Sequence, residues 1–374
     1  MQLTVNRDDL AKAISITQSI VEKKSTMPIL LNFLMQAEGD EIRLTASDLD
    51  ITATIKLNAK VKKKGSTTIN AKVFSDLVKE LPQGEISITL GDAERMEIAS
   101  LSGKSNVKIV CISSESYPDL PGLGLNVTSQ VPAEVILDMF NKTLYAASTD
   151  ETKFNLNGVY LKTEKTGKDN ALLMVSTDGH RLAIIRRVIS ELTPIEGIII
   201  PRKGVVEFKR ILEQPDLGSA IGVGISSGFF VVDTRDVKMS MRLIDGEFPD
   251  YSKVMPSQFS AKVTLDNTEL HQSLKRASLL VTEKNKCVRF DFSEGNLKIS
   301  SSSPELGEAS EELECNYTGA PLSVGFNPKY LIDILNTLDT TQKVVLELNG
   351  AFGPARLYSD ADEAYFGIVM PMRL

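Results

Sequence analysis

The chain has 374 residues, of which 42% are hydrophobic and 24% are charged, a balance that indicates two or three globular domains with apolar cores. Its three cysteines form no CxxC pair, no apolar run approaches the ~18 residues of a membrane span, and residues 1–5 do not resemble a signal peptide, so we expect a cytoplasmic protein without disulfides or a zinc site. The net charge of -7 argues against nucleic-acid binding unless basic side chains are concentrated in one place.

The first third of the chain contains two strand-helix units. A short strand at residues 3–5 precedes a predicted amphipathic helix over 8–24, and its apolar face is Leu10, Ala13, Ile14 and Thr17. A second strand at residues 68–71 leads into a predicted helix over 71–81, with an apolar face of Phe74, Leu77, Val78 and Leu81.

The same plan returns twice further along the chain. Helices are predicted over 133–148 and 201–214 in the second copy, and over 268–286 and 327–339 in the third. Each follows a short β-rich run, as in the first copy. Three similar units, each made of two similar halves, indicate an internally repeated architecture.

Proline- and glycine-rich segments at residues 117–122 and 248–256 separate the three copies. We therefore predict three domains, at 1–125, 126–256 and 257–374. Each is expected to be α+β, with two helices packed on antiparallel sheet.

The predicted helices differ in charge from the rest of the chain. Together they contain 15 basic and 13 acidic side chains, a net charge of +2 in a chain whose total is -7. This bias has the sign needed for helices that face DNA, and an ordinary set of solvated helix faces is the competing interpretation. The richest segment contains Arg202, Lys203, Lys209 and Arg210.

Few residues suggest catalysis. Gly103-Lys104-Ser105 resembles the end of a phosphate-binding loop, but Ile98 stands where that loop needs its first glycine. Asp48 and Asp50 could hold Mg²⁺ for phosphoryl transfer, although their place between two strand-like runs favours a turn. A polymerase or nuclease using this pair is the second hypothesis, and it predicts Mg²⁺-dependent consumption of nucleotide.

Residues 177–181, Thr-Asp-Gly-His-Arg, lie between two apolar runs. Asp178-Gly179 in that setting predicts a β-hairpin with a type I′ turn. The corresponding turns at 47–50 and 302–305 lack the His-Arg pair, which indicates a role specific to the middle copy. A catalytic Asp178–His180 pair is not indicated, because no nucleophile accompanies it.

Five motifs occur in order along the whole chain: Met27-Pro28-Ile29-Leu30, Thr177-Asp178-Gly179-His180-Arg181-Leu182, Pro201-Arg202-Lys203-Gly204, Phe248-Pro249-Asp250-Tyr251 and Met370-Pro371-Met372-Arg373-Leu374. As an ordered set they closely resemble the β subunit of bacterial DNA polymerase III, the sliding-clamp family. The resemblance implies three repeated DNA-clamp domains that close into a ring as a head-to-tail homodimer. It further implies a DNA sliding clamp, or processivity factor, that encircles duplex DNA and tethers the replicative polymerase and other DNA enzymes. Such a clamp is non-catalytic, has no cofactor or metal of its own, and is opened by a clamp loader.

The resemblance also implies three groups of functional residues. The groove for partner peptides corresponds to Leu156, Thr177, Gly179, His180, Arg181, Leu182, Pro249, Lys253, Val254, Asn327, Tyr330, Ile368, Met370, Pro371, Met372 and Arg373. Contacts with duplex DNA correspond to Lys24, Lys153, Phe154, Asn155 and Lys203, to which the basic segment adds Arg202, Lys209 and Arg210. The dimer contact corresponds to Lys104, Val107 and Ile109 at one end of the chain and to Leu279, Leu280, Glu305, Glu308 and Glu311 at the other.

Two of these positions depart from the family pattern. Asn155 follows Phe154 where the family often has two aromatic residues, and Val107 replaces what is often an aromatic residue. A third hypothesis, a repeat scaffold that binds proteins but never DNA, predicts no retention on closed circular DNA, whereas a clamp predicts retention that is lost when the circle is cut.

Overall fold

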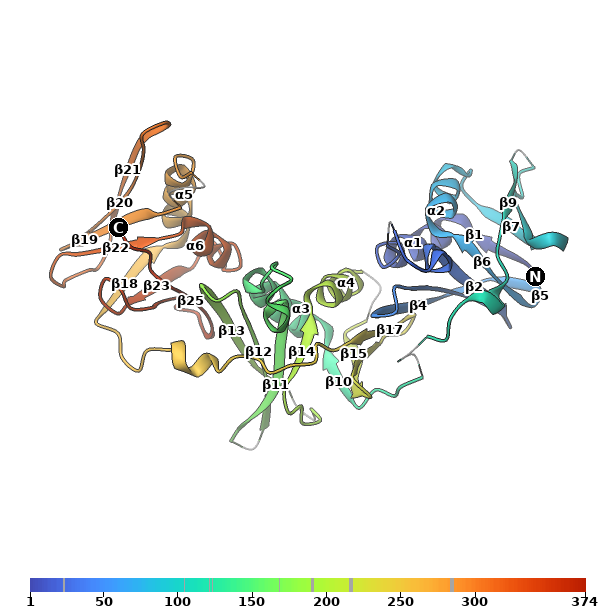
Figure 1. Ribbon diagram of the computed structural model, residues 1–374, viewed down its shortest axis with the longest axis horizontal. Coiled ribbons are helices and arrows are strands. Elements are labelled where there is room, and N and C mark those ends of the chain that lie inside the picture. The colour runs from blue at the N-terminus through green and yellow to red at the C-terminus, as the bar shows by residue number, and fades with distance from the viewer. Residues whose placement is uncertain are drawn as a thin grey trace. The chain divides into compact units, whose positions relative to one another are not determined.

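The computed structural model describes residues 1–22, 24–103, 105–120, 122, 124–167, 169–189, 192–214, 218–282 and 286–374 (Figure 1). Two compact units emerge from the contacts between residues. The first comprises Met1–Leu137, Glu191–Thr193 and Lys203–Leu243, and the second Asp138–Ser190, Pro194–Arg202 and Ile244–Leu374. Among the described residues, no helix has the length and apolar character needed to span a membrane.

The first unit contains two antiparallel sheets. A five-stranded sheet has the order β5-β1-β7-β8-β9, formed by Lys60–Lys63, Gln2–Asn6, Glu85–Leu90, Arg95–Ser100 and Asn106–Val110. An eight-stranded sheet has the order β10-β15-β16-β17-β4-β3-β2-β6, formed by Ser129–Pro132, Ala220–Ser226, Phe229–Asp233, Val237–Arg242, Ile51–Asn58, Glu41–Ser47, Asn32–Glu38 and Gly65–Asn70. Helices α1 (Arg7–Thr17) and α2 (Ala71–Glu80) pack against each other and against these strands.

The second unit repeats this arrangement. Its eight-stranded sheet has the order β14-β11-β12-β13-β25-β24-β23-β18, formed by Ile198–Pro201, Gly158–Thr166, Asp169–Thr177, Arg181–Val188, Asp362–Val369, Ala355–Ser359, Lys343–Leu348 and Ala261–Asp266. A four-stranded sheet has the order β21-β20-β19-β22, formed by Gly307–Glu314, Asn296–Ser303, Val288–Ser293 and Leu322–Phe326. Helices α5 (Asn267–Ser278) and α6 (Pro328–Leu335) pack side by side, as Figure 1 shows. Helices α3 (Ala133–Thr143) and α4 (Arg202–Leu212) each belong in part to both units.

Strand pairing also joins neighbouring repeats. In the first unit β17 pairs with β4, so that Met241 lies opposite Ile51 and Val237 opposite Ile55. In the second unit β25 pairs with β13 in the corresponding register. The two compact units therefore follow the sheets rather than the repeats, and the domain boundaries after residues 125 and 256 stay a prediction.

The helices begin where the sequence predicts them, because polar side chains cap four of them. Asn6, Asn70, Asp266 and Asn327 each accept hydrogen bonds from backbone N–H groups in the first turn of the helix that follows. These bonds satisfy donors that have no partner within the helix. Proline ends the strand before α3 and before α4 instead, so the middle copy starts its helices without such a cap.

The helices end earlier than predicted. The helix expected over 8–24 stops at Thr17, where the hydroxyl donates to the carbonyl of Ala13 and the chain tightens into turns with i→i+3 hydrogen bonds. Thr143 bonds back to Met139 in the same way before a 3₁₀ turn at Leu144–Ala146. Such bonds offer the backbone an alternative to further helix, and apolar periodicity alone does not reveal them.

The predicted type I′ turn at Asp178-Gly179 is wrong in its detail. A type I′ turn needs positive φ at both central residues, and here only Gly179, with φ of +94°, has it. The Thr177 hydroxyl instead accepts from the N–H of Gly179, and the Asp178 carboxylate accepts from the N–H groups of His180 and Arg181. The hydroxyls of Ser47 and Ser303 accept in the same way from the N–H groups of Leu49 and Glu305, so this hydrogen bond recurs in all three copies.

Candidate functional site

An apolar cluster lies on the eight-stranded sheet of the second unit. Leu182 on β13 is paired directly with Ile368 on β25, although 186 positions separate them in the sequence. The buried cluster consists of Leu173, Val175, Leu182, Ile184 and Ile368, and the partly buried side chains packed against it are Tyr160, Phe248, Tyr251 and Phe366. Sequence reasoning brought Leu182 and Ile368 together only through the family resemblance, and the structure pairs them directly.

Aromatic residues from the segment after β17 pack on this cluster. The rings of Tyr160 and Phe248 stack with centroids 4.9 Å apart, and Tyr251 lies 6.4 Å from Tyr160. A few residues further along the chain, Val254 and Met255 are exposed although both are apolar. The predicted groove residues Pro249, Lys253 and Val254 therefore belong to a segment that is anchored to the sheet by its aromatic residues.

The backbone of the C-terminal tail is tied to both sheets of the second unit, to the turn before β13 and to β22. The N–H of Met370 donates to the carbonyl of His180 at 2.9 Å, and the N–H of Met372 donates to the carbonyl of Gly325 at 2.8 Å. Pro371, which has no N–H, stands between these two donors. A Cβ at Gly325 would lie 2.8 Å from the Met372 carbonyl oxygen, so glycine is needed for this approach. The tail is therefore a structural element rather than a frayed end.

Arg181 connects the His180 turn to α6. Its guanidinium contacts the carboxylates of Asp178 and Asp333 and donates to the carbonyl of Tyr145. The ring of Tyr330 lies 4.8 Å from the guanidinium, within the range of a cation–π contact. Only 10% of the Arg181 side chain is exposed. Arg181 is thus a positioning residue that fixes the turn and the Tyr330 ring.

The remaining predicted groove residues also lie in the second unit, some of them in the turn before β13 or in the tail. Leu156 ends a 3₁₀ turn at Phe154–Leu156, and the Asn327 side chain caps α6 by accepting from the N–H of Lys329. Thr177 and Gly179 shape the turn described above. His180 and Arg373 are exposed.

Sequence reasoning missed a hollow beside the tail. A pocket of about 690 Å³ is lined by Ser323, Ala351, Phe352 and the tail residues from Pro371 to Leu374. Phe352 is 79% exposed, which is unusual for a phenylalanine and places a large apolar surface next to Met372. The sequence offered one signal for this exposed ring, because Phe352 lies between Gly350 and Gly353. An aromatic residue in such a glycine-rich turn is not expected to pack in a core.

Three of the predicted DNA contacts lie in one loop of the second unit. Phe154 is 58% exposed, and the Lys153 ammonium donates to the carbonyl of Asp178 at 3.2 Å. The amide of Asn155 donates to the carbonyl of Glu247 at 3.1 Å. Asn155 therefore ties the loop to the segment before Phe248, which gives it a structural role where the family often has an aromatic residue.

The basic side chains of the first unit differ in how far they are neutralised. Lys203 is paired with Glu22 at 3.1 Å and with Asp48. Burial lowers the pKa of Lys203, but the hydrogen bonds and charges of Asp48 and Glu22 outweigh burial and raise it above its usual value. Arg210 contacts the buried carboxylate of Glu207, whereas Lys24 is exposed. Lys203 is thus less available to a phosphate than its sequence position suggests.

The carboxylates considered for Mg²⁺ have other roles. Asp48 accepts hydrogen bonds from the N–H groups of Asp50 and Ile51 and pairs with Lys203. Asp50 pairs with Arg242 at 3.0 Å. Both side chains therefore support the turn interpretation.

Four of the predicted dimer residues lie on strands that end their sheets. Val107 and Ile109 are half-buried on β9, and Glu308 and Glu311 lie on β21. Leu279 is 75% exposed just after α5. Glu311 accepts a bidentate contact from Arg276 of its own chain, a hydrogen bond that lowers the Glu311 pKa. Lys104 lies outside the described residues.

Comparison with known proteins covers nearly the whole chain. Family models described as the N-terminal, central and C-terminal domains of the DNA polymerase III beta subunit match residues 1–121, 130–250 and 252–373. The chain is 31% identical over 377 residues to the beta sliding clamp of Caulobacter vibrioides and 32% identical over 376 residues to that of Escherichia coli, with 100% of each chain covered.

Solved structures give the same result. A Caulobacter crescentus beta sliding clamp superposes with a TM-score of 0.94 at 31% identity, covering 100% of this chain and 99% of that one. A sliding clamp from Bartonella birtlesii, solved with griselimycin bound, superposes with a TM-score of 0.94 at 30% identity and full coverage of both chains.

Proposed function

Because this chain belongs to the DNA polymerase III beta subunit family, the beta sliding clamps, we propose that it pairs with a second copy to form a closed ring around duplex DNA. A sliding clamp is a processivity factor, the non-catalytic subunit that keeps a DNA polymerase on its template. The second hypothesis, a polymerase or nuclease built on Asp48 and Asp50, is therefore rejected. The full-length match to beta sliding clamps is the observation that carries the proposal.

Ring closure is supported by two outer strands among the described sheets, one in each unit. Strand β9 ends one sheet near the start of the chain, and β21 ends another near its end. An outer strand presents unpaired N–H and C=O groups that can pair with another chain. We infer that β9 of one subunit pairs with β21 of the other, with Val107, Ile109, Leu279 and Leu280 supplying apolar contact. Ion pairs of Lys104 with Glu305 or Glu308 would help to align the two strands. They would contribute little free energy, since exposed ion pairs contribute about 0–1 kcal/mol.

We propose that DNA is held by basic side chains without sequence readout. Lys24, Lys209 and Arg210 in the first unit, and Lys153 and Arg202 in the second, are the candidates for phosphate contacts. Phe154 can stack on a base, because its ring is exposed at the tip of its loop. Lys203 contributes less, because two carboxylates already pair with it.

We propose that polymerase, clamp loader and other DNA enzymes bind through short peptides at the groove formed by Leu182, Ile368, the 249–254 segment and the tail. Apolar anchors of the peptide would contact the apolar walls, while His180 and Arg373 offer polar contacts at the edge. Met370 and Met372 suit varied partners, because methionine is flexible and polarizable. A disordered peptide loses conformational entropy on binding, so we expect affinities in the micromolar range.

Two further statements belong to this proposal. The three domains at 1–125, 126–256 and 257–374 are expected to be the units that repeat around the ring. The protein is expected to act in the cytoplasm, where a bacterial chromosome is replicated.

The decisive experiment measures retention on DNA. Purified protein is loaded onto nicked circular DNA by a clamp loader and separated from free protein by gel filtration. We expect retention on circles and rapid loss after the circle is cut once, with a mass by light scattering that corresponds to a dimer. Equal retention on cut and uncut DNA, or a monomeric mass at micromolar concentration, would reject the ring.

A second experiment tests the groove. Deleting Met370 to Leu374 should abolish binding of a polymerase tail peptide, measured by fluorescence anisotropy, because both backbone ties and both methionines are lost. Deleting Leu374 alone is the matched control, since this exposed residue provides neither tie. Undiminished affinity after the longer deletion would place the groove elsewhere.

A further inference from the structure

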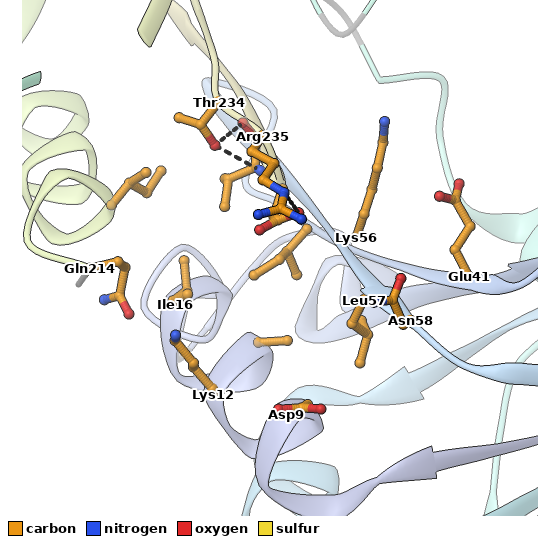
Figure 2. Close-up of a pocket in the computed structure, with 15 residues that line it drawn as sticks. Asp9, Lys12, Ile16, Glu41, Lys56, Leu57, Asn58, Gln214, Thr234 and Arg235 are labelled. Atoms are coloured by element: carbon orange, nitrogen blue, oxygen red, sulfur yellow. Dashed lines mark hydrogen bonds and ion pairs between the residues drawn. The ribbon is translucent and has the colours of Figure 1, made fainter. Parts of the chain in front are cut away.

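One cavity of the first unit has no part in the function proposed above. It has a volume of about 530 Å³ and lies beside α1, β4, the end of α4 and the turn between β16 and β17. Figure 2 shows Lys12, Ile16 and Gln214 on one side of it and Leu57, Asn58 and Glu41 on the other, with Arg235 between them. Its lining is mixed, and the buried side chains Ile55, Ile211 and Val237 form part of the apolar portion.

The repeat identifies the corresponding place in the second unit. Val237 lies opposite Ile55 where β17 meets β4, and Tyr365 lies opposite Ile185 where β25 meets β13. Counting from these pairs, Leu57 corresponds to Arg187 and Thr234 corresponds to Asp362. On the helices, Ile16 is ten residues after Asn6 and corresponds to Lys142, which is ten residues after Pro132.

In the second unit these positions are filled by large and charged side chains. Tyr365 is fully buried, and Arg187 and Lys142 contact Asp362 at 2.6 Å and 3.1 Å. The Lys142 ammonium also lies 5.4 Å from the Tyr365 ring. A tyrosine ring and an ion cluster thus occupy this space in the second unit. In the first unit the corresponding residues are smaller or uncharged: Val237, Leu57, Thr234 and Ile16.

The cavity is lined by three acidic and three basic side chains, so its preference depends on which carboxylates are already paired. Glu41 is neutralised by Arg43, which contacts it at 2.7 Å. The Arg235 side chain is 85% exposed, and the carboxylate of Asp236 lies 4.0 Å from its Nε, at the limit of an ion pair. Lys56, on the adjacent strand, is exposed as well. Arg235 and Lys56 are therefore placed to bind a negative group, while Asp9 lies at the opposite, helix side of the cavity.

We propose that this cavity binds a small organic anion with an apolar ring or chain. The volume lies within the ~300–1,000 Å³ of ordinary ligand pockets. The apolar body would lie on Ile55, Ile211 and Val237, and the anionic group would contact Arg235 and Lys56. The site belongs to the first unit alone and requires neither DNA nor a partner peptide.

The test uses two fluorescent probes with the same ring system, 8-anilinonaphthalene-1-sulfonate and the uncharged N-phenyl-1-naphthylamine. We expect the full-length protein to bind one sulfonate probe per chain. Val237→Tyr, which introduces the residue found at the corresponding position of the second unit, should weaken binding of both probes by at least about tenfold, because the added ring fills the cavity. Arg235→Gln should weaken only the sulfonate, by up to about fivefold, as expected for an exposed ion pair.

Two controls separate this site from other apolar surfaces. Deleting Met370 to Leu374 should leave sulfonate binding unchanged, because the tail belongs to the second unit. If Val237→Tyr lowers the melting temperature, a second variant is used to fill the cavity. It combines Leu57→Arg with Thr234→Asp, the residues found at the corresponding positions of the second unit. Undiminished sulfonate binding in a folded, filled variant, or loss of binding in the tail deletion, would overturn the proposal.

Discussion

Replacing Arg181 by alanine should destabilise the second unit far more than an ordinary surface substitution. The guanidinium is the shared partner of Asp178 and Asp333, whose side chains are only 19% and 24% exposed. Removing one partner of a buried ion pair costs about 3–5 kcal/mol, because the remaining charge is left without compensation. Water reaches both carboxylates here, so we expect about 3 kcal/mol. With an m value of about 3 kcal/mol/M, the urea midpoint should fall by about 1 M.

The same strand provides a matched control. Arg186 is 42% exposed and forms its ion pair with Glu164, so Arg186→Ala should cost less than about 1 kcal/mol. Urea unfolding can be followed by tyrosine fluorescence, since the chain contains 8 tyrosines and no tryptophan. Adding Asp333→Ala to Arg181→Ala should recover part of the loss, because one uncompensated carboxylate is removed. Equal midpoints for Arg181→Ala and Arg186→Ala would refute the reasoning.

Three further outcomes are expected. Leu279→Ala with Leu280→Ala should shift the light-scattering mass toward monomer, and an unchanged dimer at submicromolar concentration would count against the proposed edge contact. Lys209→Gln should reduce the slope of log K for DNA against log salt by up to about 0.9, whereas Lys203→Gln should change it less, because its charge is already paired; equal changes would contradict this. Burial raises the pKa of Asp362, but Arg187 and Lys142 outweigh burial and hold this pKa below its usual value. The stabilising contribution of Asp362 is therefore present above the unfolded pKa of about 3.9 and is lost as pH falls through the lower folded pKa. Asp362→Asn should remove this part of the acid dependence of urea unfolding, and an unchanged pH profile would contradict the assignment.

The repeated plan of the chain was visible in the sequence because it rests on local signals. Periodic apolar faces such as that of Phe74 and Val78, and polar residues such as Asn70 just before the helix, mark a helix start without knowledge of the fold. The ends of helices were harder to predict from the sequence. The apolar pattern continues to Ile20, although α1 ends at Thr17, whose hydroxyl bonds to the carbonyl of Ala13. Local pattern therefore predicts which element forms better than where it stops.

The candidate site could be predicted only in part. Leu182 and Ile368 are brought together by a strand pairing between repeats that no local pattern encodes. The role of Arg181 was hidden for the same reason, since its partner Asp333 lies 152 residues further along. The neutralisation of Lys203 by Glu22 and Asp48 likewise depends on three distant segments of the first unit.

The ladders that join neighbouring repeats have a consequence for how such chains diversify. Backbone N–H and C=O groups make the β4–β17 and β13–β25 pairings, so these contacts do not require particular side chains. The side chains around the β13–β25 pairing can therefore form an ion cluster while those around the β4–β17 pairing leave a cavity. Both strand pairings between repeats are kept. A hybrid chain that takes its last repeat from a relative should accordingly assemble, provided that the strand register and the residues flanking Tyr365 are transferred together.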